Sequence, residues 1–387
     1  MTRRTFCGTA AALPAAAHTA QGAAGFPTPR IYQQLGLKAF INATGHVTTL
    51  GGSVMPPEVL AAMTEASKSF IMVEELYHAA GRRIAELTGA EAALVTSGAA
   101  ASIVLGTAAC MTGTNREKVL QLPDTSGMKD EVLTPAIPGL NWIRYVKIAG
   151  AVLVQFEDEA DMRRKLSNRS AMVLYLPSFH GRQHAIEPLI AVAKSANVPF
   201  MVDAADELPP EDNLRTFHRK GADLVAFSGG KGLRGPQCTG LLLGRKDLID
   251  AAYLNNSPNN GIGRPMKVGK EEIAGLLTAV ELYVKRDHAA EQSRWNKQLQ
   301  FIADAVRGVP GVRTEMFEEQ FTGKGSRLRI QLPEGRLSGR DVYQRLWEGE
   351  PGIRVRTEST AIVINPQTVQ PGEERWIARR VAEVLKA

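Results

Sequence analysis

Short apolar runs alternate with helical patterns through the middle of the chain. Several runs are apolar at nearly every position, which is typical of strands covered on both faces. The candidate strands are Ala92–Thr96, Val119–Leu122, Ala151–Phe156, Ala171–Leu176, Pro199–Asp203, Leu224–Phe227 and Gly240–Leu243. The candidate helices between them are Gly98–Met111, Glu159–Leu166, Glu187–Ala196 and a shorter one after Pro210. This alternation predicts an α/β domain with a mainly parallel sheet.

A different order of elements follows a long amphipathic helix at Glu271–Arg286. Its apolar positions recur every three and four residues, and we expect it to lead out of the large domain. The elements predicted after it are a helix at Ser293–Val306, a strand at Arg327–Gln331, a helix at Gly339–Glu348, a strand at Ile362–Ile364 and a helix at Gly372–Leu385. We therefore expect a leader at 1–24, an N-terminal arm at 25–50, a large domain at 51–286 and a small α+β domain at 287–387.

The first 24 residues have the composition of a targeting segment. Arg3 and Arg4 precede a weakly apolar, Ala-rich run without an acidic residue. This pattern fits a twin-arginine signal peptide, which predicts export to the periplasm. The apolar run is far shorter than the roughly 20 residues of a membrane span, so no stable membrane anchor is expected. The alternative is a disordered Ala-rich leader on a cytoplasmic protein.

Composition narrows the class of protein. The 387 residues are 44% hydrophobic and 22% charged, which suits a globular chain with a sizeable core. The net charge of +6 comes without a Lys/Arg-dense stretch, so no nucleic-acid partner is expected. The three cysteines lack C-x-x-C spacing and nearby histidines, which argues against a zinc site or a disulfide framework.

The first candidate site is the junction Thr96–Ala101, where a strand ends and a helix begins. Small side chains in the first helical turn leave its N–H groups open to an anion. The simpler interpretation is a tight glycine-containing turn. The chain has neither G-x-x-x-x-G-K-[ST] nor G-x-G-x-x-G, so this junction is not one of those two nucleotide-binding motifs.

Two further candidates end later strands. Asp203 closes a buried run, which directs its carboxylate toward the crevice where open α/β sheets bind ligands. Lys231 follows another strand in a glycine-rich loop, where a partly desolvated lysine can attack a carbonyl. The alternatives are a capping role for Asp203 and a solvated surface lysine at 231.

Three groups that pyridoxal 5'-phosphate (PLP) requires are present in the sequence. They are the anion-binding junction Thr96–Ala101, here called the anion cradle, the acid Asp203 and the lysine Lys231. The cradle would bind phosphate, the carboxylate would pair with the ring nitrogen, and the lysine would form the Schiff base. Acid before lysine on successive strands is the aspartate-aminotransferase-like order, so we expect the α/β fold of PLP fold type I.

Longer stretches resemble the selenocysteine synthase group of PLP-dependent enzymes, which transfer selenium to L-seryl-tRNA(Sec). The similarity is greatest to its shorter members, which include D-glucosaminate-6-phosphate ammonia lyase, and it runs from about residue 31 to the C-terminus. The stretches that carry it are Ile41–Gly45, Asp203–Leu214, Gly221–Gln237, Gly240–Ile249 and Arg264–Glu271.

The resemblance implies a role for each matching position. Lys231 would be the Schiff-base lysine and Asp203 the partner of the ring nitrogen. The phosphate contacts would come from Ser97, Gly98, Ala99 and Ser228. The active site would lie at the interface of a homodimer or larger homo-oligomer, with Arg264 reaching it from the neighbouring subunit.

The sequence departs from the group between Leu122 and Gly139, where relatives carry a histidine that packs on the cofactor ring. No histidine stands there, and His180 and His184 are substitutes or simply structural residues. The residue that binds the substrate carboxylate is also open, with four candidates in the small domain: Arg327, Arg329, Arg354 and Arg356.

The function expected is that of a PLP-dependent lyase. It would eliminate the β-substituent and ammonia from a hydroxy- or β-substituted amino acid or amino sugar acid. The enzymatic alternatives are an L-seryl-tRNA(Sec) selenium transferase, a racemase and an aminotransferase. The alternative that is not an enzyme is a binding protein that kept the fold and lost catalysis.

Overall fold

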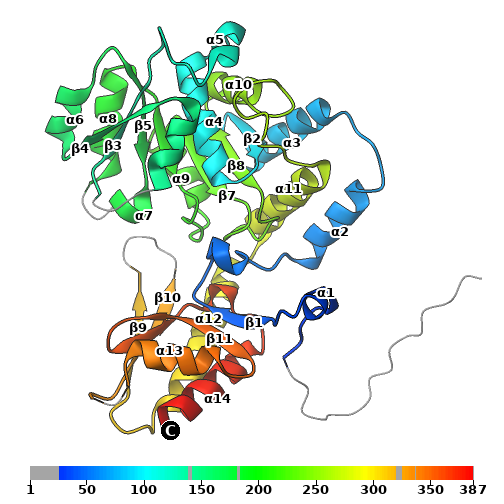
Figure 1. Ribbon diagram of the computed structural model, residues 1–387, viewed down its shortest axis with the longest axis vertical. Helices are drawn as coiled ribbons and strands as arrows, with labels where there is room; N and C mark the ends of the chain where they lie inside the picture. Colours follow the sequence, from blue (N-terminus) through cyan, green and yellow to red (C-terminus); the bar gives the residue numbers. More distant parts are fainter. Residues whose placement is uncertain (1–25, 138–141, 181–183, 320–324, 336, 387) are drawn as a thin grey trace, which may run out of the picture.

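The computed structural model describes residues 26–137, 142–180, 184–319, 325–335 and 337–386. Two sheets, each with its own hydrophobic core, form the two lobes in Figure 1. The core of the large lobe is drawn from residues between Tyr77 and Tyr283. The core of the small lobe combines Ile41 and Ala43 with residues between Leu299 and Leu385. The predicted leader, residues 1–24, lies outside the described residues.

The large lobe is built on a seven-stranded sheet in the order β2-β8-β7-β6-β5-β3-β4. Only β8 runs antiparallel to its neighbours, so β2 points in the same direction as β7 although β8 lies between them. The carboxyl ends of β2, β5, β6 and β7 therefore meet at one edge of the sheet. The strands are β2 (Ala92–Thr96), β3 (Glu131–Pro135), β4 (Val152–Phe156), β5 (Ser170–Tyr175), β6 (Phe200–Asp203), β7 (Leu224–Ser228) and β8 (Gly240–Gly244).

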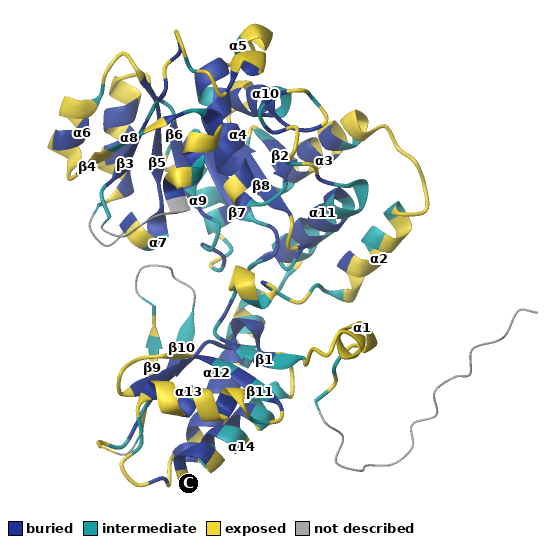
Figure 2. Cartoon of the chain, viewed as in Figure 1, coloured by how far each residue is buried: buried dark blue, intermediate teal, exposed yellow. Residues whose placement is uncertain are grey.

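Helix α4 (Ala99–Thr112) is buried almost all round, as Figure 2 shows by its dark colour. Its residues are small or aliphatic, so it packs on the sheet with one side and on α10 (Lys246–Asn255) with the other. The remaining helices of the large lobe are α2 (Pro57–Ala66), α3 (Val73–Thr88), α5 (Arg116–Gln121), α6 (Glu159–Lys165), α7 (Pro177–His180), α8 (Ile186–Ser195), α9 (Asn213–Arg219) and α11 (Lys270–Lys285).

The small lobe holds a five-stranded sheet in the order β1-β11-β12-β10-β9. Its first strand comes from the N-terminal arm and pairs in parallel with β11. The strands are β1 (Phe40–Ala43), β9 (Arg313–Glu318), β10 (Ser326–Gln331), β11 (Gly352–Thr357) and β12 (Ala361–Ile364). Its helices are α12 (His288–Val306), α13 (Gly339–Trp347) and α14 (Glu373–Lys386).

One predicted strand, Val119–Leu122, is wrong. Most of this run belongs to the helix α5, and the strands that the sequence pattern did not predict are β1, β3, β9 and β11. The side chain of Asn115 explains the helix, because it accepts hydrogen bonds from the backbone N–H groups of Glu117 and Lys118. That N-cap starts the helix before the β-branched residue that suggested a strand.

The chain between β1 and α2 crosses from the small lobe to the large one. Ser53 Oγ donates to Gly230 O at 2.9 Å, and Gln237 Nε2 donates to Thr48 O at 2.8 Å. Gly52 has φ +71°, and a Cβ there would lie 2.5 Å from Gly230 O, so this approach requires glycine. The crossing segment is therefore docked on the loop that carries Lys231.

Neither a membrane-spanning helix nor a metal cluster is found in the described residues. None of the helices described is long and apolar enough to cross a membrane. In the same parts of the chain, no group of three or more His, Cys, Asp or Glu side chains is arranged to hold a metal ion.

Candidate active site

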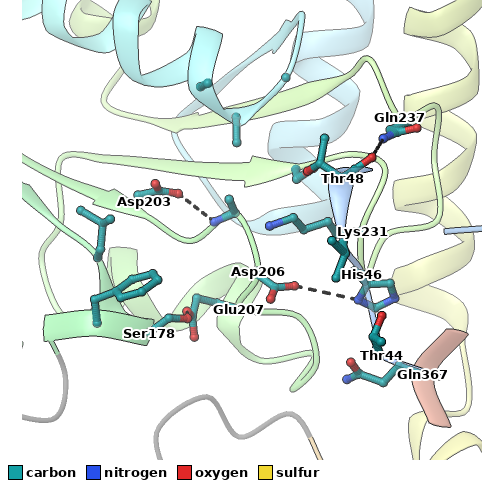
Figure 3. A pocket seen from close by; sticks show the side chains of 18 of the residues that line it. Thr44, His46, Thr48, Ser178, Asp203, Asp206, Glu207, Lys231, Gln237 and Gln367 are labelled. Carbon is teal, nitrogen blue, oxygen red and sulfur yellow. Dashed lines mark hydrogen bonds and ion pairs between the residues drawn. The ribbon is translucent and has the colours of Figure 1, made fainter. Parts of the chain in front are cut away.

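A cavity of about 800 Å³ opens at the edge where β2, β5, β6 and β7 end, and residues of the small lobe complete its wall. Six of the seven predicted site residues line it. Figure 3 shows Asp203 and Lys231 on neighbouring parts of the wall. The six are Ser97, Gly98, Ala99, Asp203, Ser228 and Lys231.

The end of β2 and the start of α4 form the predicted anion cradle. Gly98 has φ +109°, a conformation that a residue with a side chain rarely adopts. Thr96 Oγ1 fixes the turn, since it donates to Gly98 O at 3.1 Å and lies 2.7 Å from Ser102 Oγ. The N–H groups of the first turn of α4 have no acceptor within the helix, so they and the helix dipole favour an anion there.

Asp203 ends β6 and is held by two donors. The backbone N–H of Ala205 donates to Oδ1 at 3.1 Å, and the Tyr145 hydroxyl donates to Oδ2 at 3.2 Å. Burial nevertheless raises the pKa of the Asp203 carboxyl above its ordinary value, an effect that these hydrogen bonds and the nearby charge of Lys231 oppose. A positively charged ring nitrogen would compensate this buried carboxylate.

Lys231 follows β7 in a tight loop. Its carbonyl accepts from the N–H of Arg234 at 3.0 Å, while Gly229 donates to Thr239 O and accepts from Gly235 N. The side chain is half-buried and extends along the cavity (Figure 3). Among the described residues, none forms a hydrogen bond or ion pair with Nζ, so the amine is available to a ligand.

Two of the four candidate arginines reach the cavity. Arg327 is 1% exposed, and Arg356 lies beside it, both near Glu319 at 4.0 and 3.5 Å. Burial lowers the pKa of Arg327 to about 10, so it remains a cation at neutral pH. By contrast, Arg329 pairs with Glu315 and Glu358.

The fourth candidate, Arg354, is also outside the cavity lining, because it stacks on the rings of Tyr343 and Trp347. The three-dimensional structure thus separates arginines that are equivalent in the sequence.

Arg264 is the predicted site residue that does not line the cavity of its own chain. It is exposed, and its Nη1 donates to Ser257 Oγ at 3.3 Å. Its expected contact with the site of a neighbouring subunit stays a prediction.

Neither of the two histidines considered as ring-packing substitutes lines the cavity. His180 is fully buried, and its Nδ1 accepts from the N–H of Leu176 at 2.9 Å. Burial lowers its pKa to about 3, so it is a neutral structural residue. His184 packs edge-on against Phe156.

Sequence reasoning missed several polar groups of the cavity. Tyr145 comes from the 3₁₀ segment Trp142–Ala149, which closely follows the region where the sequence departs from its relatives. His46 directly follows the Ile41–Gly45 stretch, and its Nδ1 lies 3.9 Å from Asp206 Oδ1. Proximity to Ile41–Gly45 was the one local signal for His46.

Comparisons with known proteins identify relatives of this chain. The family model of L-seryl-tRNA selenium transferase (SelA) matches residues 179–313. D-glucosaminate-6-phosphate ammonia lyase of Salmonella typhimurium is 32% identical, covering 93% of this chain and 99% of that protein. A 5'-C-glycyluridine monooxygenase-decarboxylase from a Streptomyces species is 30% identical, covering 92% of each.

Solved structures show the same relationship. The structure of D-glucosaminate-6-phosphate ammonia lyase superposes with a TM-score of 0.81 at 31% identity, over 93% of this chain and 99% of that one. A serine palmitoyltransferase from S. paucimobilis with bound PLP shares the fold at a TM-score of 0.58 and 14% identity, over 89% of this chain and 87% of that one. The α/β fold is therefore fold type I of the PLP-dependent enzymes, as expected. The chain belongs to the selenocysteine synthase-like family that includes D-glucosaminate-6-phosphate ammonia lyase.

Proposed function

We propose that this chain is a PLP-dependent lyase that removes the β-hydroxyl and the amino group from an amino sugar acid or a related hydroxy amino acid. The observation that carries the proposal is one cavity that gathers an anion cradle, a buried carboxylate and an available lysine amine. These groups fit PLP, because each matches one part of the cofactor: phosphate, ring nitrogen and aldehyde.

The fit identifies the residues that would hold PLP. The first-turn N–H groups of α4, with Ser97 and Ser228, would bind the phosphate. Asp203 would keep the ring nitrogen protonated, and Lys231 would bind the aldehyde carbon. Bound PLP would supply an electron sink that stabilises negative charge at the substrate Cα.

The chain's own groups would do the remaining work. Lys231 Nζ would act as the base that takes the proton from the substrate Cα. Loss of the β-hydroxyl as water, and then hydrolysis, releases a 2-oxo acid and ammonium. Arg327 and Arg356 would orient an acidic group of the substrate, since both are cations on the wall contributed by the small lobe.

The cavity lining favours a hydroxylated substrate. Beyond Lys231 it carries the hydroxyl groups of Thr44 and Ser178 and the side-chain amides of Asn365 and Gln367. Such groups can donate to and accept from sugar hydroxyls. The relative at 32% identity is named for D-glucosaminate 6-phosphate, which is a substrate of this kind.

An ammonia-release assay tests the proposal. The PLP-loaded protein should convert D-glucosaminate 6-phosphate, D-glucosaminate or one of the serine enantiomers to equal amounts of ammonium and 2-oxo acid. Lys231→Ala should abolish this activity, whereas Lys246→Ala, at an exposed lysine paired with Asp250, should retain it. Absence of ammonia release with all of these substrates, or undiminished release by Lys231→Ala, would refute the proposal.

A transferase is the second candidate, because the SelA family model matches the segment that contains Asp203 and Lys231. Both reactions begin by labilising the same bonds at Cα and Cβ and differ in the group that then reacts at Cβ. Incubation with L-seryl-tRNA(Sec) and selenophosphate, with analysis of the aminoacyl group, distinguishes them. Selenocysteinyl-tRNA without free ammonia would favour the transferase.

We also propose that the twin-arginine leader directs export. The proposal rests on the sequence of residues 1–24 alone. N-terminal sequencing of protein from separated periplasmic and cytoplasmic fractions checks it, and an intact Met1 or Thr2 in the cytoplasm would contradict export.

A further inference from the structure

His46 lines the same cavity as Lys231, although it comes from the other end of the chain. Its side chain is 3% exposed, and its Nδ1 lies 3.9 Å from Asp206 Oδ1. Figure 3 shows Asp206 on the same side of the cavity as Lys231, with its ion pair to His46 drawn. The cavity therefore contains a histidine and carboxylate pair in addition to the groups that fit PLP.

The position of His46 is fixed from both lobes. Asn42 Nδ2 donates to Gly45 O at 3.0 Å, which ties the residue before His46 to β1. On the other side, Thr48 O accepts from Gln237 in the loop of Lys231. Because one short segment joins both anchors, His46 is held at a defined place relative to Lys231.

Asp206 is the acidic neighbour that an imidazolium at His46 would face. An opposite charge within about 4 to 6 Å stabilises the ionised form of a side chain. The Asp206 side chain is 39% exposed, whereas the imidazole of His46 is 3% exposed. The other charged groups of the lining are Asp203, Glu207, Lys231, Glu319, Arg327 and Arg356.

Loss of a β-hydroxyl requires a proton donor, because hydroxide is a poor leaving group. Lys231 would hold the proton taken from Cα and return it there in the reverse reaction, so a second donor lets the hydroxyl leave without using that proton. Asp203 would be engaged with the ring nitrogen, and Glu207 already accepts a hydrogen bond from Ser178. Arginine guanidinium groups do not release protons at neutral pH. The Tyr145 hydroxyl already donates to Asp203, so His46 is the lining group best suited to act as a general acid, a role that histidine takes most often.

We propose that His46, supported by Asp206, is the general acid that protonates the departing β-hydroxyl. The inference rests on the proposed lyase function. Lys231 Nζ would first take the proton from Cα, reversibly, and the electron pair left at Cα would then form the Cα–Cβ double bond as the Cβ–O bond breaks. The Cβ–O pair leaves with the oxygen, and the imidazolium proton converts it to water.

The test separates proton removal at Cα from loss of the hydroxyl. In D2O, exchange of the Cα proton of D-glucosaminate 6-phosphate and of D- and L-serine is monitored by NMR, and ammonia release is measured in parallel. His46→Gln should lower ammonia release roughly 10²- to 10⁴-fold, the usual contribution of a general acid, while Cα exchange continues. Asp206→Asn should give a smaller loss in the same direction.

The control variant is His78→Gln, an exposed histidine of α3 whose ring contacts Tyr253 outside the cavity. It should leave both rates unchanged. Equal loss of exchange and ammonia release in His46→Gln would show that His46 serves folding or cofactor binding, and unchanged ammonia release would show that it is not needed. Either result overturns the inference and leaves the lyase function intact. A wild-type protein that neither exchanges nor releases ammonia would refute the function and the inference together.

Discussion

The Tyr145 hydroxyl donates a hydrogen bond of 3.2 Å to Asp203 Oδ2. Tyr145 lies shortly after the segment in which the sequence lacks the histidine of its relatives, and its hydroxyl reaches the carboxylate proposed to face the ring nitrogen. Burial raises the pKa of Tyr145, so it remains a neutral donor. The segment that follows the missing histidine therefore still contributes one side chain, Tyr145, to the site.

We predict that Tyr145→Phe weakens catalysis without unfolding the chain. A hydrogen bond to a charged group contributes roughly 1.5 kcal/mol at the low end, which corresponds to about a tenfold loss of kcat/KM. The absorbance of bound PLP should also change, because the charge at its ring nitrogen depends on Asp203. Unchanged kinetics and spectrum would show that the hydrogen bond has no catalytic role.

The raised pKa of Asp203 predicts a pH effect on the protein without cofactor. The folded chain binds a proton at Asp203 more tightly than the unfolded chain does, so this residue favours folding at low pH. That contribution is lost as the pH rises through the folded-state pKa. Asp203→Asn should therefore raise the Tm of the cofactor-free protein at neutral pH and have less effect near pH 4.

The comparison is made by thermal unfolding of the two proteins at several pH values, with PLP removed. The same substitution should weaken PLP binding, because it removes the charge that pairs with the ring. A Tm difference that does not depend on pH would contradict the assignment of the effect to ionisation of Asp203.

The arginines of the small lobe should respond differently to substitution. Arg356→Lys and Arg327→Lys, in the cavity wall, should raise KM roughly 10- to 100-fold, since each weakens a charged hydrogen bond to substrate. Arg329 lies in a separate ion-pair cluster, so Arg329→Lys should leave KM unchanged. Steady-state ammonia release checks both. A larger effect from Arg329 than from Arg356 would contradict the placement.

Gly98→Ala tests the phosphate cradle. No atom lies within 4 Å of the added Cβ, so the cost comes from the backbone conformation at φ +109°, roughly 1–3 kcal/mol. Because relief of that strain would move the turn, PLP affinity should fall about tenfold or more. Gly89→Ala, at φ +71° with equal space, should cost about 1 kcal/mol in stability without changing PLP affinity. Equal affinities in the two variants would argue against the cradle.

The strands predicted correctly are those with strong local signals. β2 and β7 are continuous apolar runs buried on both faces, and such runs leave little alternative to a central strand. β9 has no such signal, because most of its side chains are exposed and its sequence is mainly polar. Its pairing with β10, rather than its own composition, makes it a strand.

The same distinction applies to the site. Asp203 and Lys231 were identified because each stands at the end of a recognisable strand within a local motif. Tyr145 lies 58 positions from Asp203, and nothing near Tyr145 in the sequence indicates that contact. His46 depends on the crossing segment that docks at Gly230. The arginines of each strand share one face, so the choice among them depends on how far along β10 or β11 each stands.

The most direct test of the central claim is covalent trapping of PLP. Incubation of the protein with PLP, reduction with borohydride and peptide mass spectrometry should locate one pyridoxyl group on Lys231. Lys231→Ala should lose both the label and the visible absorbance of the bound cofactor, and Lys246→Ala should keep them. Labelling spread over surface lysines, or undiminished in Lys231→Ala, would contradict the assignment of this cavity as a PLP site.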